Sequence, residues 1–219
     1  QWKMKSAKTI ALLQQKGGSG KTTTCVNIAG SLKEMGYKVA ICDMDKDKPD
    51  AWSWAVKNDS MKNMVYQIDE KQAREQITKL KAHHDYLIID TPPNFQTAAL
   101  KAALLADLVV IPTAPSGMDL SGLMEAKDLA MTASRPFKLL ANRIVKNTTM
   151  SRSLLSVLFE EKENAFRVNI SQSVKFVEAE AEGLYIGDYA KNSILHKQLK
   201  RLGKEIEMFF AYKTEACTA

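Results

Sequence analysis

Cysteine is scarce in this sequence of 219 residues, and its placement excludes two classes of protein. The three cysteines, Cys25, Cys42 and Cys217, form no CxxC pair and leave an odd number. This pattern supports neither a disulfide-stapled scaffold nor a zinc ribbon. Chains without a disulfide framework are typical of reducing compartments, so we expect this protein in the cytoplasm.

Long apolar runs are missing as well. No stretch of about 18 apolar residues occurs, so the sequence predicts no membrane-spanning helix and no stable membrane association. The N-terminal residues lack the apolar core of a signal peptide. The first methionine is residue 4, and we expect residues 1–7 to be a tag remnant or a disordered start.

Prolines are few and dispersed, so no linker is visible. The chain has six prolines, no Ser/Gly-rich stretch and no repeat period. Hydrophobic residues make up 45% and charged residues 26%, a globular rather than a disordered composition. The net charge of +6 permits an anionic partner without requiring one.

Short apolar runs alternate with longer amphipathic stretches. Strands are expected over residues 9–13, 39–42, 64–66, 86–89, 108–111 and 137–141, and helices over residues 21–35, 71–82, 96–105, 119–133 and 192–210. Most of the runs are almost entirely apolar, as in strands that are buried on both faces of a parallel sheet. The pattern predicts one α/β domain over residues 8–212, with a mostly parallel sheet flanked by helices, and a C-terminal tail over residues 213–219.

The most informative stretch is residues 15–23, which read QKGGSGKTT between a predicted strand and a predicted helix. Glycines let the backbone curl so that N–H groups point at phosphate oxygens, and the helix N-terminus adds a positive dipole end. Lys21 would then reach the terminal phosphates and the Thr22 hydroxyl would ligate Mg²⁺. A glycine-rich turn without function is the alternative, but this set of residues at fixed offsets is rare by chance. The predicted ATP-binding residues of this loop are Gly17, Gly18, Ser19, Gly20, Lys21, Thr22 and Thr23.

Two acidic motifs follow at the ends of predicted strands. Asp43 and Asp45 follow the second strand, and we expect both carboxylates to face the nucleotide, since ligands of open α/β sheets bind at the carboxyl ends of the strands. Asp90 ends the fourth expected strand, which is apolar, and this pattern holds Mg²⁺, usually through a water. Either motif alone is also typical of a strand-end turn. In this order after the phosphate loop, they predict a site for ATP and Mg²⁺.

The sequence resembles the ParA/MinD family of deviant Walker A ATPases, and in particular the small plasmid-partition ParA proteins. The residues that carry the resemblance are 16–24, 43–45, 90–93, 111–113 and 142–143, and the resemblance extends over residues 8–210. It implies a P-loop NTPase fold and Mg²⁺-dependent hydrolysis of ATP to ADP and phosphate.

The resemblance also implies roles for single residues. Lys16 matches the signature lysine, which crosses an ATP-sandwich dimer to the partner's phosphates, and Gly17 matches the glycine that allows the two subunits to approach. Asp45 matches the residue that orients the attacking water, and Asp90 matches the Mg²⁺-linked carboxylate. Asn142 falls where the family often places a residue that contacts the base. The expected catalytic residues are Lys16, Lys21 and Asp45.

The chain departs from the family after its acidic pair. Many relatives continue with Pro-Gln, whereas this chain continues with Lys46 and Asp47. Trp52 and Trp54 follow, and we expect both in the core, because large aromatic side chains bury most of their area.

The C-terminal helix is predicted to carry a basic stripe. Residues 190–204 contain five cations and no acid, and several of them lie opposite an apolar face at helical spacing. The apolar face consists of Leu195, Leu199, Leu202, Ile206 and Phe209. The stripe is either an ordinary solvated surface or a surface for the phosphate backbone of DNA. The resemblance favours DNA, because small ParA dimers bind nucleoid DNA nonspecifically through C-terminal basic residues. The predicted DNA-binding residues are Lys175, Lys197, Lys200, Arg201 and Lys204, with Arg167 as a further candidate.

The function that the resemblance implies is DNA partition. An ATP-dependent homodimer would associate with the nucleoid, and a ParB-like centromere-binding adaptor would stimulate hydrolysis and release. One alternative is a MinD-like ATPase at a membrane surface, for which residues 206–213 offer the only terminal apolar segment. Another is an ATPase that positions an organelle or a conjugation complex. A metal-cluster enzyme on the same fold is disfavoured by the unpaired cysteines.

Overall fold

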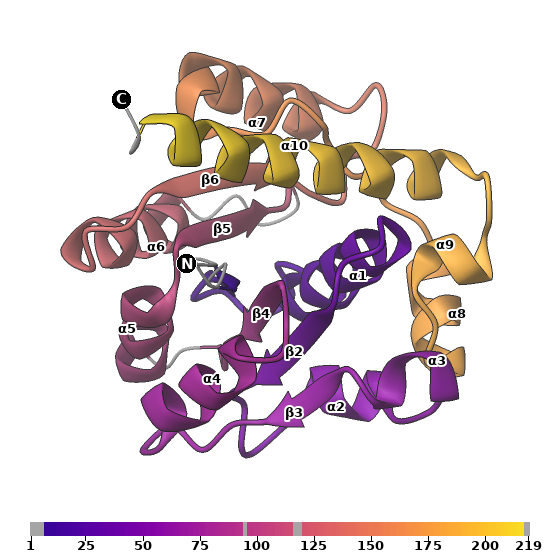
Figure 1. Ribbon diagram of the computed structural model, residues 1–219. Coiled ribbons are helices and arrows are strands. Elements are labelled where there is room, and N and C mark those ends of the chain that lie inside the picture. The colour runs from indigo at the N-terminus through magenta and orange to yellow at the C-terminus, as the bar shows by residue number, and fades with distance from the viewer. Residues whose placement is uncertain (1–6, 94–95, 116–119, 217–219) are drawn as a thin grey trace.

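A computed structural model describes residues 7–93, 96–115 and 120–216 (Figure 1). Most of the expected tag remnant or disordered start therefore lies outside the described residues. Ala7 is described, and it is buried in the core at 3% exposure. Within the described residues, no helix is both long enough and apolar enough to cross a bilayer.

Six parallel strands form one sheet in the order β3-β2-β4-β1-β5-β6 (Figure 1). They are β1 (Lys8–Leu12), β2 (Val39–Asp43), β3 (Val65–Gln67), β4 (Tyr86–Asp90), β5 (Leu108–Thr113) and β6 (Phe137–Ala141). Parallel neighbours need long crossover connections, which helices provide here. The predicted α/β architecture is confirmed, and all carboxyl ends of the strands lie along one edge of the sheet.

Helices cover both faces of the sheet (Figure 1). They are α1 (Lys21–Glu34), α2 (Asp50–Ala55), α3 (Asp59–Lys62), α4 (Ala73–Lys81), α5 (Gln96–Leu105), α6 (Leu120–Thr132), α7 (Thr149–Glu160), α8 (Lys175–Glu182), α9 (Ile186–Tyr189) and α10 (Ile194–Ala216), with a 3-10 turn at Lys162–Asn164. The short helices α2 and α3 were not predicted, because four to six residues carry too little periodicity. The predicted boundary at residue 212 falls inside α10, which continues to Ala216.

Alternate side chains of the strands enter two separate hydrophobic cores. In β1, Ile10 and Leu12 pack under α1, α2, α8, α9 and α10. Ala11 and the following Leu13 pack under α4, α5, α6 and α7 on the other face. The neighbouring strands divide in the same way, because successive side chains of a strand point to opposite faces. Burial on both faces explains why these strands are almost wholly apolar.

Helix α10 packs across α1 through the predicted apolar face. Leu195, Leu199, Leu202 and Ile206 are each 2% exposed or less. The last buried position belongs to Phe210 rather than to the predicted Phe209, which is only partly buried. The Phe210 ring contacts Tyr86 of β4 edge to face, with ring centroids 5.9 Å apart. This contact explains why Phe210 is buried more fully than Phe209.

The two tryptophans of α2 have different environments. Trp54 is 1% exposed, and its Nε1–H donates to the carbonyl of Leu184 at 3.1 Å. Trp52 is 38% exposed, so the expectation of a core position is wrong for this residue. Residues two apart on a helix do not share a face, and α2 has only one face against the core.

Candidate nucleotide-binding site

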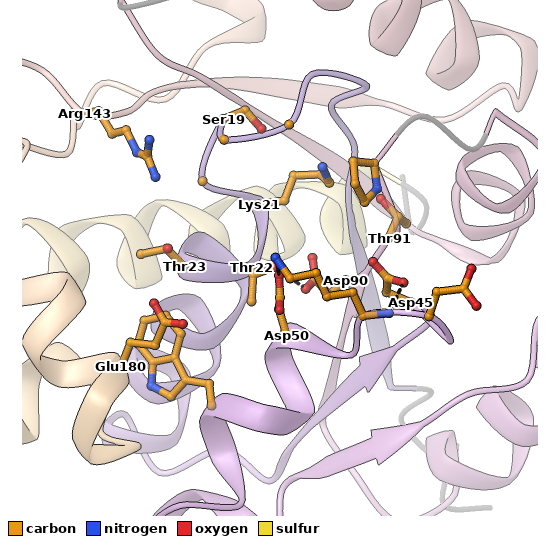
Figure 2. Close-up of a pocket in the computed structure, with 17 residues that line it drawn as sticks. Ser19, Lys21, Thr22, Thr23, Asp45, Asp50, Asp90, Thr91, Arg143 and Glu180 are labelled. Atoms are coloured by element: carbon orange, nitrogen blue, oxygen red, sulfur yellow. Dashed lines mark hydrogen bonds and ion pairs between the residues drawn. The ribbon is translucent and has the colours of Figure 1, made fainter.

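A cleft of about 460 Å³ lies at the carboxyl edge of the sheet (Figure 2). Its lining comprises residues 17–23 of the phosphate loop, Asp45, Asp47, Lys48 and Asp50 after β2, Asp90, Thr91 and Pro93 at the end of β4, and Trp54, Arg143 and Glu180. The three predicted motifs therefore meet in one place, because parallel strands deliver their carboxyl ends to the same edge.

The phosphate loop ends on a helix N-terminus whose capping residue, Gly20, supplies no side-chain hydrogen bond. Gly20 precedes α1 with φ of 88°, a left-handed conformation that favours glycine. The first turn of α1 contains no acidic residue and receives no side-chain hydrogen bond from the capping position. Its backbone N–H groups and positive dipole end are thus left to an anionic ligand in the cleft.

Asn142 supports this loop from behind instead of lining the cleft. Its side chain is 6% exposed, and its Nδ2 donates to the carbonyl of Ser19 at 3.1 Å. A Cβ on Gly20 would overlap this amide, so a side chain at that position has no room. The base contact of Asn142 stays a prediction, although its side chain is not part of the lining of the cleft. The strand order explains the contact, since only β5 separates β6 from β1.

Thr22 and Asp90 form the contact that suits a divalent cation. The Thr22 hydroxyl donates to Asp90 Oδ2 at 2.7 Å. Asp90 is 2% exposed, and its second oxygen, Oδ1, is buried without a hydrogen-bond partner among the described residues. A hydroxyl and a carboxylate are hard oxygen ligands of the kind that Mg²⁺ prefers, so the donor set fits that ion.

The raised pKa of Asp90 also favours a bound cation at this position. Burial raises the pKa of Asp90 to about 7, and the charges of Asp43 and Asp50 add to this effect. The hydrogen bond from Thr22 and the charge of Lys21 oppose it without cancelling it. Burial also lowers the pKa of the Lys21 ammonium, despite the nearby carboxylates. A buried carboxylate with too little compensating charge gains most from a bound cation.

The two carboxylates at the end of β2, Asp43 and Asp45, make different contacts. Asp43 accepts the backbone N–H of Asp45 at 3.0 Å and of Trp52 at 2.9 Å, and so fixes the loop and the start of α2. It does not line the cleft, contrary to the expectation that both carboxylates face the nucleotide. Burial raises the pKa of Asp43 to about 6, and these two hydrogen bonds limit the rise. Asp45 does line the cleft, and its Oδ1 accepts the N–H of Lys48 at 2.9 Å.

Lys16 lies on the exposed outer side of the phosphate loop. It is absent from the lining of the cleft, whereas Lys21 is 6% exposed and lies inside it. A Cβ on the neighbouring Gly17 would meet nothing within 4 Å, so this rim of the loop is open. The structure thus separates the two predicted catalytic lysines into one that lines the cleft and one that is exposed outside its lining.

Five charged residues that line the cleft were not predicted as site residues: Asp47, Lys48, Asp50, Arg143 and Glu180. Lys48 lies on the loop after β2, where its Nζ is 3.5 Å from Asp50 Oδ2. Arg143 follows Asn142 at the end of β6, a strand-end position that the sequence already marked. Glu180 belongs to α8, and no motif in the surrounding sequence predicts its place in the cleft. The packing of the last third of the chain brings it there.

The basic residues predicted on α10 are exposed. Lys197, Lys200, Arg201 and Lys204 all lie on the solvent side of the helix. Two of them have acidic neighbours: Lys200 Nζ is 3.9 Å from Glu34 Oε1, and Lys204 Nζ is 3.1 Å from Glu207 Oε2.

A second hollow, of about 330 Å³, lies against this stripe. Its lining is Arg167, Lys200, Arg201, Lys204 and Glu205. The Glu205 carboxylate accepts hydrogen bonds from the backbone N–H groups of Arg167 at 2.8 Å and Val168 at 2.9 Å. The cations therefore dominate the hollow. Lys175, at the first residue of α8, is exposed but does not line it.

A cluster of metal ligands is absent from the part of the chain that the structure describes, where no three His, Cys, Asp or Glu residues gather to hold a metal. Cys25 and Cys42 are buried in the two different cores, and Cys217 lies outside the described residues. These observations give the metal-cluster alternative no donor set among the described residues.

Comparison with known proteins identifies related sequences. The family model described as "AAA domain" matches residues 7–79 and 64–138. Maintenance of carboxysome distribution protein A of Gloeobacter kilaueensis is 32% identical over 130 residues, 58% of each chain. Chromosome partitioning protein ParA of Myxococcus xanthus is 24% identical over 245 residues, 90% of this chain and 87% of that protein. The chain spans only 58% to 62% of the length of several curated relatives that it matches.

Solved structures share the fold. The septum site-determining protein MinD of Pyrococcus horikoshii, complexed with Mg-ADP, superposes with a TM-score of 0.77 at 21% identity over 94% of this chain and 98% of that one. A putative plasmid partition protein of Borrelia burgdorferi, bound to AMPPNP, superposes with a TM-score of 0.73 at 20% identity over 94% and 99%. At these identities the likeness establishes the fold.

Proposed function

This chain belongs to the AAA-domain family of ParA/MinD-type P-loop ATPases, and from that premise we propose that it is a DNA-partition ATPase. In this proposal it dimerises on ATP, binds DNA nonspecifically, and hydrolyses ATP when a ParB-like centromere-binding partner stimulates it. The observation that carries the ATPase part is the Thr22–Asp90 pair, whose buried Asp90 Oδ1 has no partner among the described residues, beside the α1 N-terminus that Gly20 leaves without a side-chain cap.

Binding of the nucleotide is assigned to the loop and to α1. The backbone N–H groups around Gly18 and Gly20 cradle the phosphates, and Lys21 pairs with their terminal oxygens. Thr22 and Asp90 would hold Mg²⁺, which when bound neutralises charge on the β- and γ-phosphates. The partial desolvation of Lys21 strengthens its attraction to the phosphates, because water screens the interaction less.

Hydrolysis is assigned to Asp45 and Lys16. Asp45 lines the cleft with one carboxylate oxygen anchored by the Lys48 N–H, which leaves the other oxygen to orient a water for attack. Lys16 is exposed and lies outside the lining of its own cleft, as a lysine would that serves the phosphates of a second subunit. A cation at that point stabilises the charge that develops on the transferred group.

Nonspecific DNA binding is assigned to α10. The hollow lined by Arg167, Lys200, Arg201 and Lys204 presents several cations on one exposed surface. Such a surface attracts the phosphate backbone without reading bases. Lys197 extends it by one turn, and Lys175 stands apart on α8.

The membrane alternative has less support. Its terminal apolar segment would need free apolar side chains, but Ile206 is 0% exposed and Phe210 is 4% exposed in the core. Only Met208 and Tyr212 of this stretch present large exposed apolar side chains among those described. Positioning of a protein organelle remains compatible with the same DNA-binding cycle, and the resemblance to a carboxysome distribution protein supports that cargo class.

The test of DNA binding is a charge reversal on α10. The variant Lys197→Glu, Lys200→Glu, Lys204→Glu should lose DNA binding in a fluorescence titration with ATP and Mg²⁺ and keep its affinity for ATP. For any affinity that remains, the slope of log affinity against log salt concentration should be smaller in magnitude by up to about three, about one for each lost phosphate contact. The matched control, Lys71→Glu, Lys79→Glu, Lys81→Glu around α4, carries the same charge change on another surface.

Three results decide between the alternatives. Unchanged DNA affinity in the α10 variant would refute this assignment. Equal DNA binding by the wild type with ADP and with ATP would contradict the proposed cycle. Sedimentation with liposomes in the presence of ATP, without DNA binding, would favour the membrane alternative.

A further inference from the structure

We propose that Arg143 is a phosphate-contacting residue of the nucleotide site, with its guanidinium on the phosphate groups that the loop cradles. The inference rests on the proposed function, since it deepens the same site. It concerns a residue that the sequence motifs did not assign to the nucleotide.

The position of Arg143 brings its guanidinium to the phosphate loop. Arg143 lines the cleft, and its Nε lies 3.7 Å from the position that a Cβ would take on Gly20. Gly20 is the capping position of α1, next to the backbone N–H groups of the first helical turn. In Figure 2, Arg143 approaches the loop from the side opposite Asp45, and its guanidinium points toward the loop.

Among the described residues, the guanidinium of Arg143 has no protein partner that neutralises its charge. Arg143 is exposed, and its side chain makes no hydrogen bond or ion pair within the described ranges 7–93, 96–115 and 120–216. Glu180 also lines the cleft but forms no ion pair with it in the described structure. An unpaired guanidinium at the rim of a phosphate loop is available to an anionic ligand, because its planar fork matches two phosphate oxygens.

The backbone holds Arg143 in a costly conformation. Its φ is 55°, in the left-handed region that non-glycine residues rarely adopt. Hydrogen bonds on both sides enforce it: Asn142 N–H donates to Thr113 O at 2.9 Å, and Ile144 N–H donates to Ile170 O at 2.9 Å. Such strain persists where the surroundings over-determine it, and it gathers at ligand sites. Glycine would fit this backbone better, so the arginine side chain must serve another purpose here.

Arg143 and Lys21 would therefore hold the phosphates from two directions. Lys21 rises from the first turn of α1, inside the loop, and is 6% exposed. Arg143 comes from the end of β6, across the capping residue. Two cations on separate elements would fix the position of bound phosphates better than a single cation, because each contact limits their movement along a different direction.

The test compares Arg143→Gly with wild type in competition against a fluorescent ATP analogue. The competing probes are ATP and inorganic tripolyphosphate, both with Mg²⁺. Loss of one charge-assisted contact should weaken both probes about tenfold. Arg143→Lys should retain part of the affinity, because the charge remains without the fork. Lys146→Gly, which removes an exposed cation three residues away and outside the cleft lining, should change neither affinity.

A stability measurement separates this role from a structural one. Glycine relieves the left-handed strain, so ligand-free Arg143→Gly should melt at the same temperature as wild type or higher. Lower affinity in a protein of equal or greater stability supports a ligand contact.

Two results would overturn the proposal for Arg143 and leave the proposed nucleotide site intact. One is wild-type affinity of Arg143→Gly for both probes. The other is weaker binding of ATP with unchanged binding of tripolyphosphate, which would place Arg143 on the base or ribose. If Lys21→Ala binds both probes as tightly as wild type, or wild type binds neither, the proposed nucleotide site itself fails and this inference with it.

Discussion

Replacing Asp90 with asparagine should stabilise the ligand-free protein above neutral pH. The carboxylate is 2% exposed, stands beside Asp43 on the neighbouring strand, and has one oxygen without a partner among the described residues. These surroundings raise the pKa of Asp90 from 3.8 to about 7 in the folded state. Asparagine has the same shape, is always neutral, and can still accept the hydrogen bond of Thr22 through its carbonyl oxygen.

The pKa shift sets the size and the sign of the effect. A folded-state pKa above the unfolded value means that this group favours folding below about pH 4 and loses that contribution as the pH rises through 7. At about 1.4 kcal/mol per pKa unit, a rise of three units corresponds to about 4 kcal/mol when Asp90 is fully ionised. Asp43 shares part of the repulsion, so we expect a gain of about 2 to 4 kcal/mol for Asp90→Asn at pH 8 and almost none at pH 4.

Urea unfolding in EDTA at pH values from 4 to 8 measures this gain. The free energy of unfolding of wild type should fall with rising pH more steeply than that of Asp90→Asn. Asp188→Asn, at an exposed aspartate of α9, should stay within about 0.5 kcal/mol of wild type. With ATP present, Mg²⁺ should stabilise wild type but not Asp90→Asn. Two outcomes would refute the reasoning. Asp90→Asn could be less stable than wild type at pH 8, or the difference in free energy of unfolding between the two proteins could be the same at every pH.

Two further substitutions test how the site is supported. Gly30→Ala places a Cβ against the ring of Tyr185, so we expect a loss of about 1 to 3 kcal/mol in urea unfolding, and unchanged stability would contradict this close packing of α1 on α9. Asn142→Ala leaves the carbonyl of Ser19 without its amide donor, so it should cost about 1 to 2 kcal/mol and weaken ATP binding in the same titration used above. Wild-type affinity for ATP in Asn142→Ala would show that the loop keeps its shape without this contact.

Much of the fold was predictable because its signals are local. Apolar runs located all six strands, since burial on both faces leaves no polar positions in them. Helices α2 and α3, of six and four residues, were missed, and α7, α8 and α9 had no predicted bounds. The start of α2 is tied by Asp43 through the N–H of Trp52, which no sequence window reveals.

The candidate site divides in the same way. By itself, the sequence determined the phosphate loop, the pair Asp43 and Asp45, and Asp90, because their residue types and their places at strand ends follow from the chemistry of phosphate and Mg²⁺. Only the tertiary structure decided which polar residue at each strand end reaches the cleft. Asp43 turned to the backbone while Asp45 faced the cleft, and Asn142 held the loop while Arg143 lined the opening. Adjacent residues differ in this way because the fold, through backbone direction and neighbouring hydrogen bonds, sets where each side chain points.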